Sequence, residues 1–208
     1  MNHSVNCPLG RKNFFASVSV VLGFLIHSFS AFSQYDSTLT FSLGYYGNNL
    51  WNPGFSFDTD YTFRETKADD DKSRSYLKQL SAQVKLAGYA DPNIYQARFV
   101  QAGFRYRKIK PRGFYCMLGI SPLGLYRSFL PETYQVSSKG DVTKITIPGR
   151  WYFAPEVSAG LGKVTSIQNP TGVYAHIHLM VLMPYNTYVL PLLNVELGYQ
   201  FAIKFRRK

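Results

Sequence analysis

Two histidines and a glutamate are the residues of this sequence best suited to chemistry. His176 and His178 are two residues apart, so a β-strand would point both imidazoles to the same side. Glu196 lies in the next run of alternating residues, where strand pairing would bring its carboxylate close. Imidazole nitrogens and carboxylate oxygens bind zinc and also act as acid/base pairs. The spacing is therefore compatible with a metal site, or with a hydrolytic site acting on lipid.

Neutral histidines that are hydrogen-bonded inside a polar interior explain the same spacing. The pattern fixes no third ligand and no nucleophile. The sequence also contains no glycine-rich phosphate loop, no paired-cysteine zinc spacing and no serine elbow. We favour the structural interpretation, in which the protein has no cofactor, binds no metal and is not an enzyme.

The elements that position these residues are strands with two unlike faces. The final run, 192–205, places seven large apolar residues on one parity: Leu193, Val195, Leu197, Tyr199, Phe201, Ile203 and Phe205. Such a run is longer than the ~5–6 residues usual in soluble sheets and exceeds the ~9–11 residues with which a tilted strand crosses a bilayer. It predicts a membrane-crossing β-strand.

Seven further runs alternate in the same way. They are Thr38–Tyr46, Phe55–Arg64, Tyr76–Leu86, Gln96–Arg107, Phe114–Ser121, Trp151–Gly162 and Val173–Met183. We expect Lys67–Ser75 to be a solvated connection, Pro122 to break the fifth run, and Val142–Ile147 to form a hairpin arm. The pattern predicts an all-β fold, an eight-stranded antiparallel transmembrane β-barrel.

Glycine placement indicates which face lies inside. Six glycines occur on the polar parity: Gly44, Gly103, Gly119, Gly160, Gly162 and Gly198. Glycine weakens a strand, but it makes room inside a narrow barrel. Aromatic residues also recur at the ends of the apolar parities, as membrane interfaces favour. We therefore expect the apolar face to meet lipid. The alternative is a soluble lipocalin-like carrier, with its apolar face inside.

Charged residues of both signs fall on the inward parity. They are Asp58, Asp60, Arg64, Lys85, Arg105, Arg107, Glu156, Glu196 and Lys204. Unpaired buried charge is costly, so these side chains should pair. The pairing allows either a gated pore or a salt-bridged plug, and an eight-stranded barrel is about wide enough for side chains alone. We predict the plug.

Two other side chains stand out from the pattern. Trp51 lies in a turn-rich loop, where it would contact a partner protein, rest among lipid headgroups or cap the lumen. Cys116 falls on the lipid-facing parity and is most simply a small apolar residue.

The first 33 residues have the pattern of a cleaved signal peptide. Arg11 and Lys12 precede an apolar run that ends in Ala31-Phe32-Ser33. Cleavage before Gln34 leaves a barrel over 34–208, lowers the formal charge from +11 to +9, and leaves Cys116 without a disulfide partner. We expect the basic excess to attract outer-membrane lipid headgroups, and we expect no nucleic-acid partner in an exported chain.

Two segments carry a family resemblance, Gly44-Tyr-Tyr-Gly-Asn-Asn-Leu-Trp-Asn-Pro-Gly-Phe55 and Pro184-Tyr-Asn-Thr-Tyr-Val-Leu-Pro191. With them the chain resembles small outer-membrane β-barrel proteins of the Bacteroidota type, over residues 34–205. The resemblance implies the architecture and a location in the bacterial outer membrane, and it carries no catalytic residue set. We expect a structural, surface-interaction or accessory role, with other envelope proteins as possible partners.

Overall fold

The computed structural model describes residues 38–48, 51–70, 74–91, 95–130, 134–136, 140–144, 148–165, 171–185 and 188–204. The regular elements in these ranges are all β-strands. The same ranges contain no apolar helix of membrane-spanning length. The predicted signal peptide, residues 1–33, and its cleavage site lie outside the described residues.

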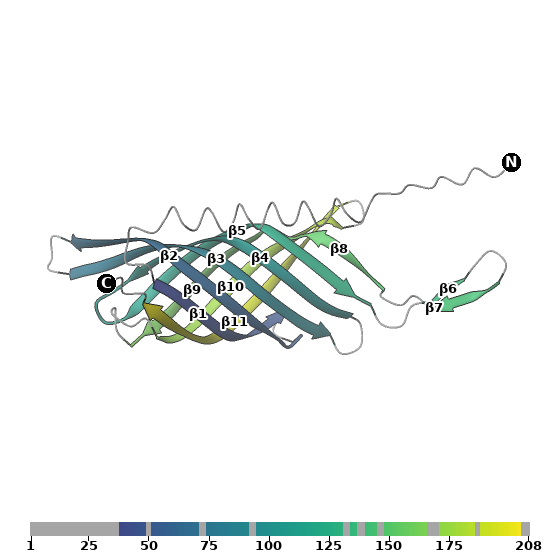
Figure 1. The fold of residues 1–208 in the computed structure, drawn as a ribbon, viewed down its shortest axis with the longest axis horizontal. Helices are drawn as coiled ribbons and strands as arrows, with labels where there is room; N and C mark the ends of the chain where they lie inside the picture. Colours follow the sequence, from purple (N-terminus) through teal and green to yellow (C-terminus); the bar gives the residue numbers. More distant parts are fainter. Residues whose placement is uncertain are drawn as a thin grey trace. The chain divides into compact units, whose positions relative to one another are not determined.

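The strands close into an antiparallel ring (Figure 1). In chain order its members are β1 (Thr38–Asn48), β2 (Gly54–Asp70), β3 (Arg74–Asp91), β4 (Tyr95–Ile109), β5 (Phe114–Phe129), β8 (Gly149–Phe153), β9 (Glu156–Val164), β10 (Gly172–Tyr185) and β11 (Tyr188–Lys204). Consecutive strands of the ring pair, except that β8 and β9 each pair with β5 and β10 instead, and β1 pairs with β11 to close the ring. Because β8 and β9 both lie between β5 and β10, they are two halves of one strand, interrupted at Ala154 and Pro155. The predicted all-β, eight-stranded antiparallel barrel is confirmed.

Two predicted boundaries are wrong. The segment expected to be a solvated connection is a hairpin, because β2 extends to Asp70 and β3 begins at Arg74. Pro122 does not end the fifth strand either. Ala102 pairs with Leu123 and Phe104 with Ile120, so Ser121 and Pro122 together face one residue of β4. This bulge accommodates a proline that cannot donate to the ladder, and the strand continues to Phe129.

The connection between β5 and β8 contains the predicted hairpin arm. β6 (Tyr134–Val136) pairs with β7 (Val142–Lys144) in a separate two-stranded sheet. The described side chains of β7 are exposed. This connection leaves the barrel at the same end as the turns that follow β1, β3 and β10.

The exterior of the barrel is apolar and the interior is polar. Large apolar side chains stand exposed along every strand of the ring, for example Phe55 at 71%, Leu118 at 62% and Ile177 at 56%. Lys85, at 0% exposure, represents the many polar side chains that are buried inside. A lipocalin-like carrier has the opposite arrangement. An apolar exterior around a polar interior is typical of membrane barrels.

Interior glycines lie beneath large side chains. Gly44 and Gly198 are aligned on β1 and β11, and the hydroxyl of Tyr174 lies over both. A β-carbon would lie 2.8 Å from that hydroxyl at Gly44 and 2.6 Å from it at Gly198. Gly160 lies in the same way beneath the ring of His176. These glycines make room for side chains that cross the lumen, as the sequence predicts.

Candidate functional site in the barrel interior

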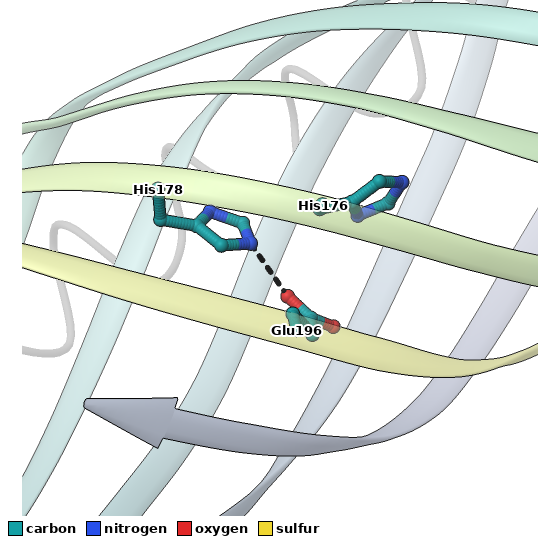
Figure 2. A group of neighbouring side chains, drawn as sticks. All are labelled: His176, His178 and Glu196. Carbon is teal, nitrogen blue, oxygen red and sulfur yellow. Dashed lines mark ion pairs between the residues drawn. The ribbon is translucent and has the colours of Figure 1, made fainter. Parts of the chain in front are cut away.

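Two interior carboxylates converge on one histidine of β10. The Nδ1 atom of His178 lies 2.8 Å from Oε1 of Glu156 on β9, and its Nε2 atom lies 2.9 Å from Oε2 of Glu196 on β11. Figure 2 shows the contact between His178 and Glu196. A neutral imidazole has a single N–H donor, whereas both nitrogens here face carboxylate oxygens. The Lys85 ammonium also lies 3.2 Å from Nδ1 and 3.4 Å from Nε2, so His178 and Lys85 share both carboxylates.

Lys85 of β3 neutralises the same carboxylates. Its Nζ atom lies 3.0 Å from Oε2 of Glu196 and 3.5 Å from Oε1 of Glu156. The other oxygen of Glu196 accepts hydrogen bonds from the Ser56 hydroxyl, at 2.8 Å, and the Tyr174 hydroxyl, at 2.7 Å. Glu196 therefore has hydrogen-bond or ion-pair partners at both oxygens.

His176, the second histidine of the predicted pair, has different surroundings. It is 1% exposed, and within the described residues neither of its ring nitrogens has a hydrogen-bond partner. Its ring stacks on Tyr174, with the centroids 4.4 Å apart. Figure 2 shows His176 and His178 on the same strand. Contact with an aromatic ring, not a hydrogen-bond network, holds His176 in place.

The predicted metal-binding trio does come together. His176, His178 and Glu196 offer ligand atoms that all lie within 4.8 Å of one another. However, the Lys85 ammonium already contacts Oε2 of Glu196, and each nitrogen of His178 already contacts a carboxylate. A metal ion would have to displace that ammonium and take up a deprotonated His178. The donor set is present, but its contacts fit an ion-pair network and not a metal centre.

A second charged group lies on β2 and β4. Asp60 Oδ2 lies 2.6 Å from Nη1 of Arg105 and 2.5 Å from Nη2 of Arg107. Asp58 lies 3.5 Å from Arg105 and is aligned with Lys85 across β2 and β3. Asp58 therefore lies between the two charged groups, which form one network across the lumen.

Seven of the nine predicted lumen charges are buried inside: Asp58, Asp60, Lys85, Arg105, Arg107, Glu156 and Glu196. The prediction for Arg64 is wrong, because this residue is exposed. Thr62 pairs with Ser81 and Arg64 with Leu80, so β2 has an extra residue at Phe63 that turns Arg64 outward. The side chain of Lys204 lies outside the described residues.

Sequence reasoning overlooked an interior aromatic layer near the β5–β8 connection. Its members are Tyr46, Tyr89, Phe99, Tyr126 and Tyr152. The hydroxyls of Tyr89 and Tyr126 lie 2.9 Å apart, and Asn48 donates to Tyr89 at 3.2 Å. The available signal was parity, since Tyr46, Tyr89, Phe99 and Tyr152 share the inward parity of their strands; for Tyr126 the bulge at Ser121 and Pro122 reverses that signal. The layer fills the lumen beside the charged network.

Trp51 lies outside the interior network. Its side chain is 85% exposed, and the turn that carries it is closed by backbone hydrogen bonds between Asn48 and Asn52. Cys116 is a free, exposed residue on the apolar exterior.

The comparisons with known proteins give information on the fold alone. No family model matches the chain, and no curated protein matches it. Among solved structures, it is similar to Neisserial surface protein A (16% identity, TM-score 0.46, covering 81% of this chain and 96% of that one). It is also similar to the N-terminal β-barrel domain of Pseudomonas aeruginosa OprF (12%, 0.47, 81% and 98%) and to Ail of Yersinia pestis (9%, 0.40, 81% and 97%).

Proposed function

We propose that this protein is an integral β-barrel of the bacterial outer membrane whose sealed lumen does no chemistry. Its role is structural, surface-interacting or accessory to a larger envelope assembly. The observation that carries the proposal is the combination of an apolar exterior with an interior of paired charges. Removal of residues 1–33 as a signal peptide and kinship with the Bacteroidota type of small barrel are parts of this proposal, supported by the sequence patterns described above.

The ion pairing of the interior supports a plug and not a pore. Four buried carboxylates, on Asp58, Asp60, Glu156 and Glu196, face three permanent cations and the bridging His178. Among the described residues each of these carboxylates lies within 3.5 Å of at least one of the cations. Opening the lumen would break ion pairs whose partners are fully buried, which is costly. The interior therefore favours a permanently closed barrel.

The order of contacts argues against a hydrolytic site. Nucleophilic catalysis requires a base that contacts the nucleophile's hydroxyl, with an acid on the far side of the base. Here the Ser56 hydroxyl donates to Glu196, and Glu196 also contacts His178. The carboxylate therefore occupies the place where the base should be. Ser56 is also fully buried, out of reach of a lipid substrate.

Membrane fractionation and electrical recording test the proposal. The protein should co-fractionate with the outer membrane, and its gel mobility should shift on heating. In planar bilayers the wild-type protein should show no ion conductance. Stable single-channel conductance, or recovery of the protein in a soluble fraction, would contradict the proposal.

The enzymatic alternative has its own test. Purified protein is incubated with phospholipid and with outer-membrane glycolipid, and released fatty acid is measured beside a His176→Ala/His178→Ala variant. We expect the wild-type and variant proteins to give the same background. Fatty-acid release that depends on the histidines would establish the enzyme instead.

A further inference from the structure

The exterior of the barrel carries an unusual cationic cluster where β4, β5 and β8 meet. Arg98 is aligned with Arg127, and Arg127 with Trp151, across the two strand pairs. The guanidinium carbons of Arg98 and Arg127 lie 5.1 and 4.9 Å from the centroid of the Phe129 ring, and Arg127 also lies 4.9 Å from the Trp151 ring. We refer to Arg98, Arg127, Phe129 and Trp151 as the arginine cluster.

The arginine cluster has no acidic partner in the part of the chain that the structure describes. None of the ion pairs there includes Arg98 or Arg127. The Nε atom of Arg127 is buried and, among the described residues, has no hydrogen-bond acceptor. Two cations held on one aromatic ring repel each other, so an anion that bridges them would relieve the repulsion. The cluster is therefore complementary to a negatively charged ligand.

A groove on the same exterior includes Arg98 in its lining. It has a volume of about 740 Å³ and is formed by β2, β3 and β4. Gly88 and Ala90, on the outward parity of β3, offer no large side chain here, while Phe55 on β2 stands 71% exposed beside them. Gly88 is aligned with Arg98 on one side and with Phe55 on the other. The result is a largely apolar groove with a guanidinium in its wall.

The position along the barrel matches a lipid headgroup layer. The arginine cluster lies at the end of β5 and the start of β8, which flank the long 130–148 connection, and at the start of β4 beside them. Long connections of outer-membrane barrels face outward, and short turns such as 110–113 face the periplasm. Trp151, 61% exposed, has the amphipathic ring that membrane interfaces favour.

We propose that the arginine cluster and the adjoining groove bind one phosphate-bearing membrane lipid. Arg98 and Arg127 contact the phosphate, and one acyl chain lies in the groove over Gly88 and Ala90. Arginine suits this role because its planar guanidinium donates paired hydrogen bonds to phosphate oxygens and stacks on aromatic rings at the same time. The inference rests on the membrane placement proposed above, but not on the plugged lumen.

Titration with matched lipids tests the site. Purified barrel in neutral detergent is titrated with phosphatidic acid, with diacylglycerol of the same chains, and with inorganic phosphate, and bound species are counted by native mass spectrometry. We expect one phosphatidic acid to bind about tenfold more tightly than diacylglycerol, the gain of roughly one charge-assisted contact. Inorganic phosphate alone should not bind at the concentrations that saturate with lipid.

Three variants show which residues provide the affinity for the lipid. Arg98→Gln/Arg127→Gln should lose the preference for phosphatidic acid, and Ala90→Leu, which fills the groove, should weaken both lipids equally. The matched control is Lys110→Gln/Lys163→Gln at the opposite end of the barrel, where Lys163 stacks on Phe114 at 5.2 Å. We expect this control to behave as wild type.

Several outcomes would overturn the proposal. They are equal affinity for the two lipids, full competition by inorganic phosphate, an unchanged arginine variant, or an equal loss in the lysine control. Heat-shifted gel mobility is recorded for every variant, so that loss of the folded barrel is separated from loss of the site. A folded barrel without lipid preference would refute this inference and leave the proposed function intact.

Discussion

Replacing Lys85 with methionine tests whether the interior network holds the barrel together. Lys85 is fully buried, and its ammonium contacts Glu196 at 3.0 Å and Glu156 at 3.5 Å. Methionine has a similar stem but no charge, so the two carboxylates would lose the cation between them and keep only His178 and hydroxyl groups such as those of Ser56 and Tyr174 as contacts. Removing one partner of a buried ion pair costs about 3–5 kcal/mol. We expect Lys85→Met to lower the free energy of unfolding by that amount.

A second substitution shows that charge is the cause. Glu196→Gln in the Lys85→Met background removes the excess negative charge while keeping an acceptor for the Ser56 and Tyr174 hydroxyls. Coupled residues in one network deviate from additivity by about 0.5–3 kcal/mol. The double variant should therefore be more stable than the sum of the two single changes predicts.

Equilibrium unfolding of barrels reconstituted in lipid vesicles measures these differences. Denaturant is titrated while the fluorescence of Trp51 and Trp151 is followed, and unheated gel samples report the folded fraction. The control is Lys110→Met, an exposed lysine in the β4–β5 turn, which should change stability by less than about 0.5 kcal/mol. A Lys85→Met variant within about 1 kcal/mol of wild type, or additive single effects, would refute the reasoning.

Four further predictions concern single features of the barrel. His176→Leu should leave the free energy of unfolding unchanged or raise it by about 1 kcal/mol, because His176 has no hydrogen-bond partner among the described residues. His178→Leu should lower it by several kcal/mol, because His178 bridges two carboxylates. The reverse order of stabilities in the unfolding assay would contradict the site geometry. Gly160→Val should destabilise the barrel by displacing the ring of His176, seen as a lower unfolding midpoint than in an exterior Ala159→Val control. Neither zinc nor a chelator should shift the unfolding midpoint, because the Lys85 ammonium already occupies the position beside Glu196 where a metal cation would bind. A rise of the midpoint with zinc would instead support the metal-site hypothesis. Trp51→Ala should leave stability within about 0.5 kcal/mol, because the side chain is 85% exposed.

The amino-acid sequence by itself determined the strands and their two faces. Alternation is a local property, because side chains of a strand point to opposite sides whatever that strand pairs with. The runs that contain Lys85, His178 and Glu196 therefore identified these residues as inward-facing. The glycines of the same parity identified a crowded interior, which the position of Tyr174 over Gly44 and Gly198 bears out.

Only the tertiary structure decided which side chains meet. The contact of Lys85 with Glu196 joins β3 to β11 through the lumen, and it depends on the register of every strand in the ring. Two bulges, at Phe63 and at Ser121 with Pro122, each invert the parity that follows, and the first turns Arg64 outward. A bulge depends on the partner strand as much as on its own residues, so the pattern of one run cannot reveal it. For the same reason the conversion of a possible metal trio into an ion-pair network became visible only when Lys85 was placed beside it.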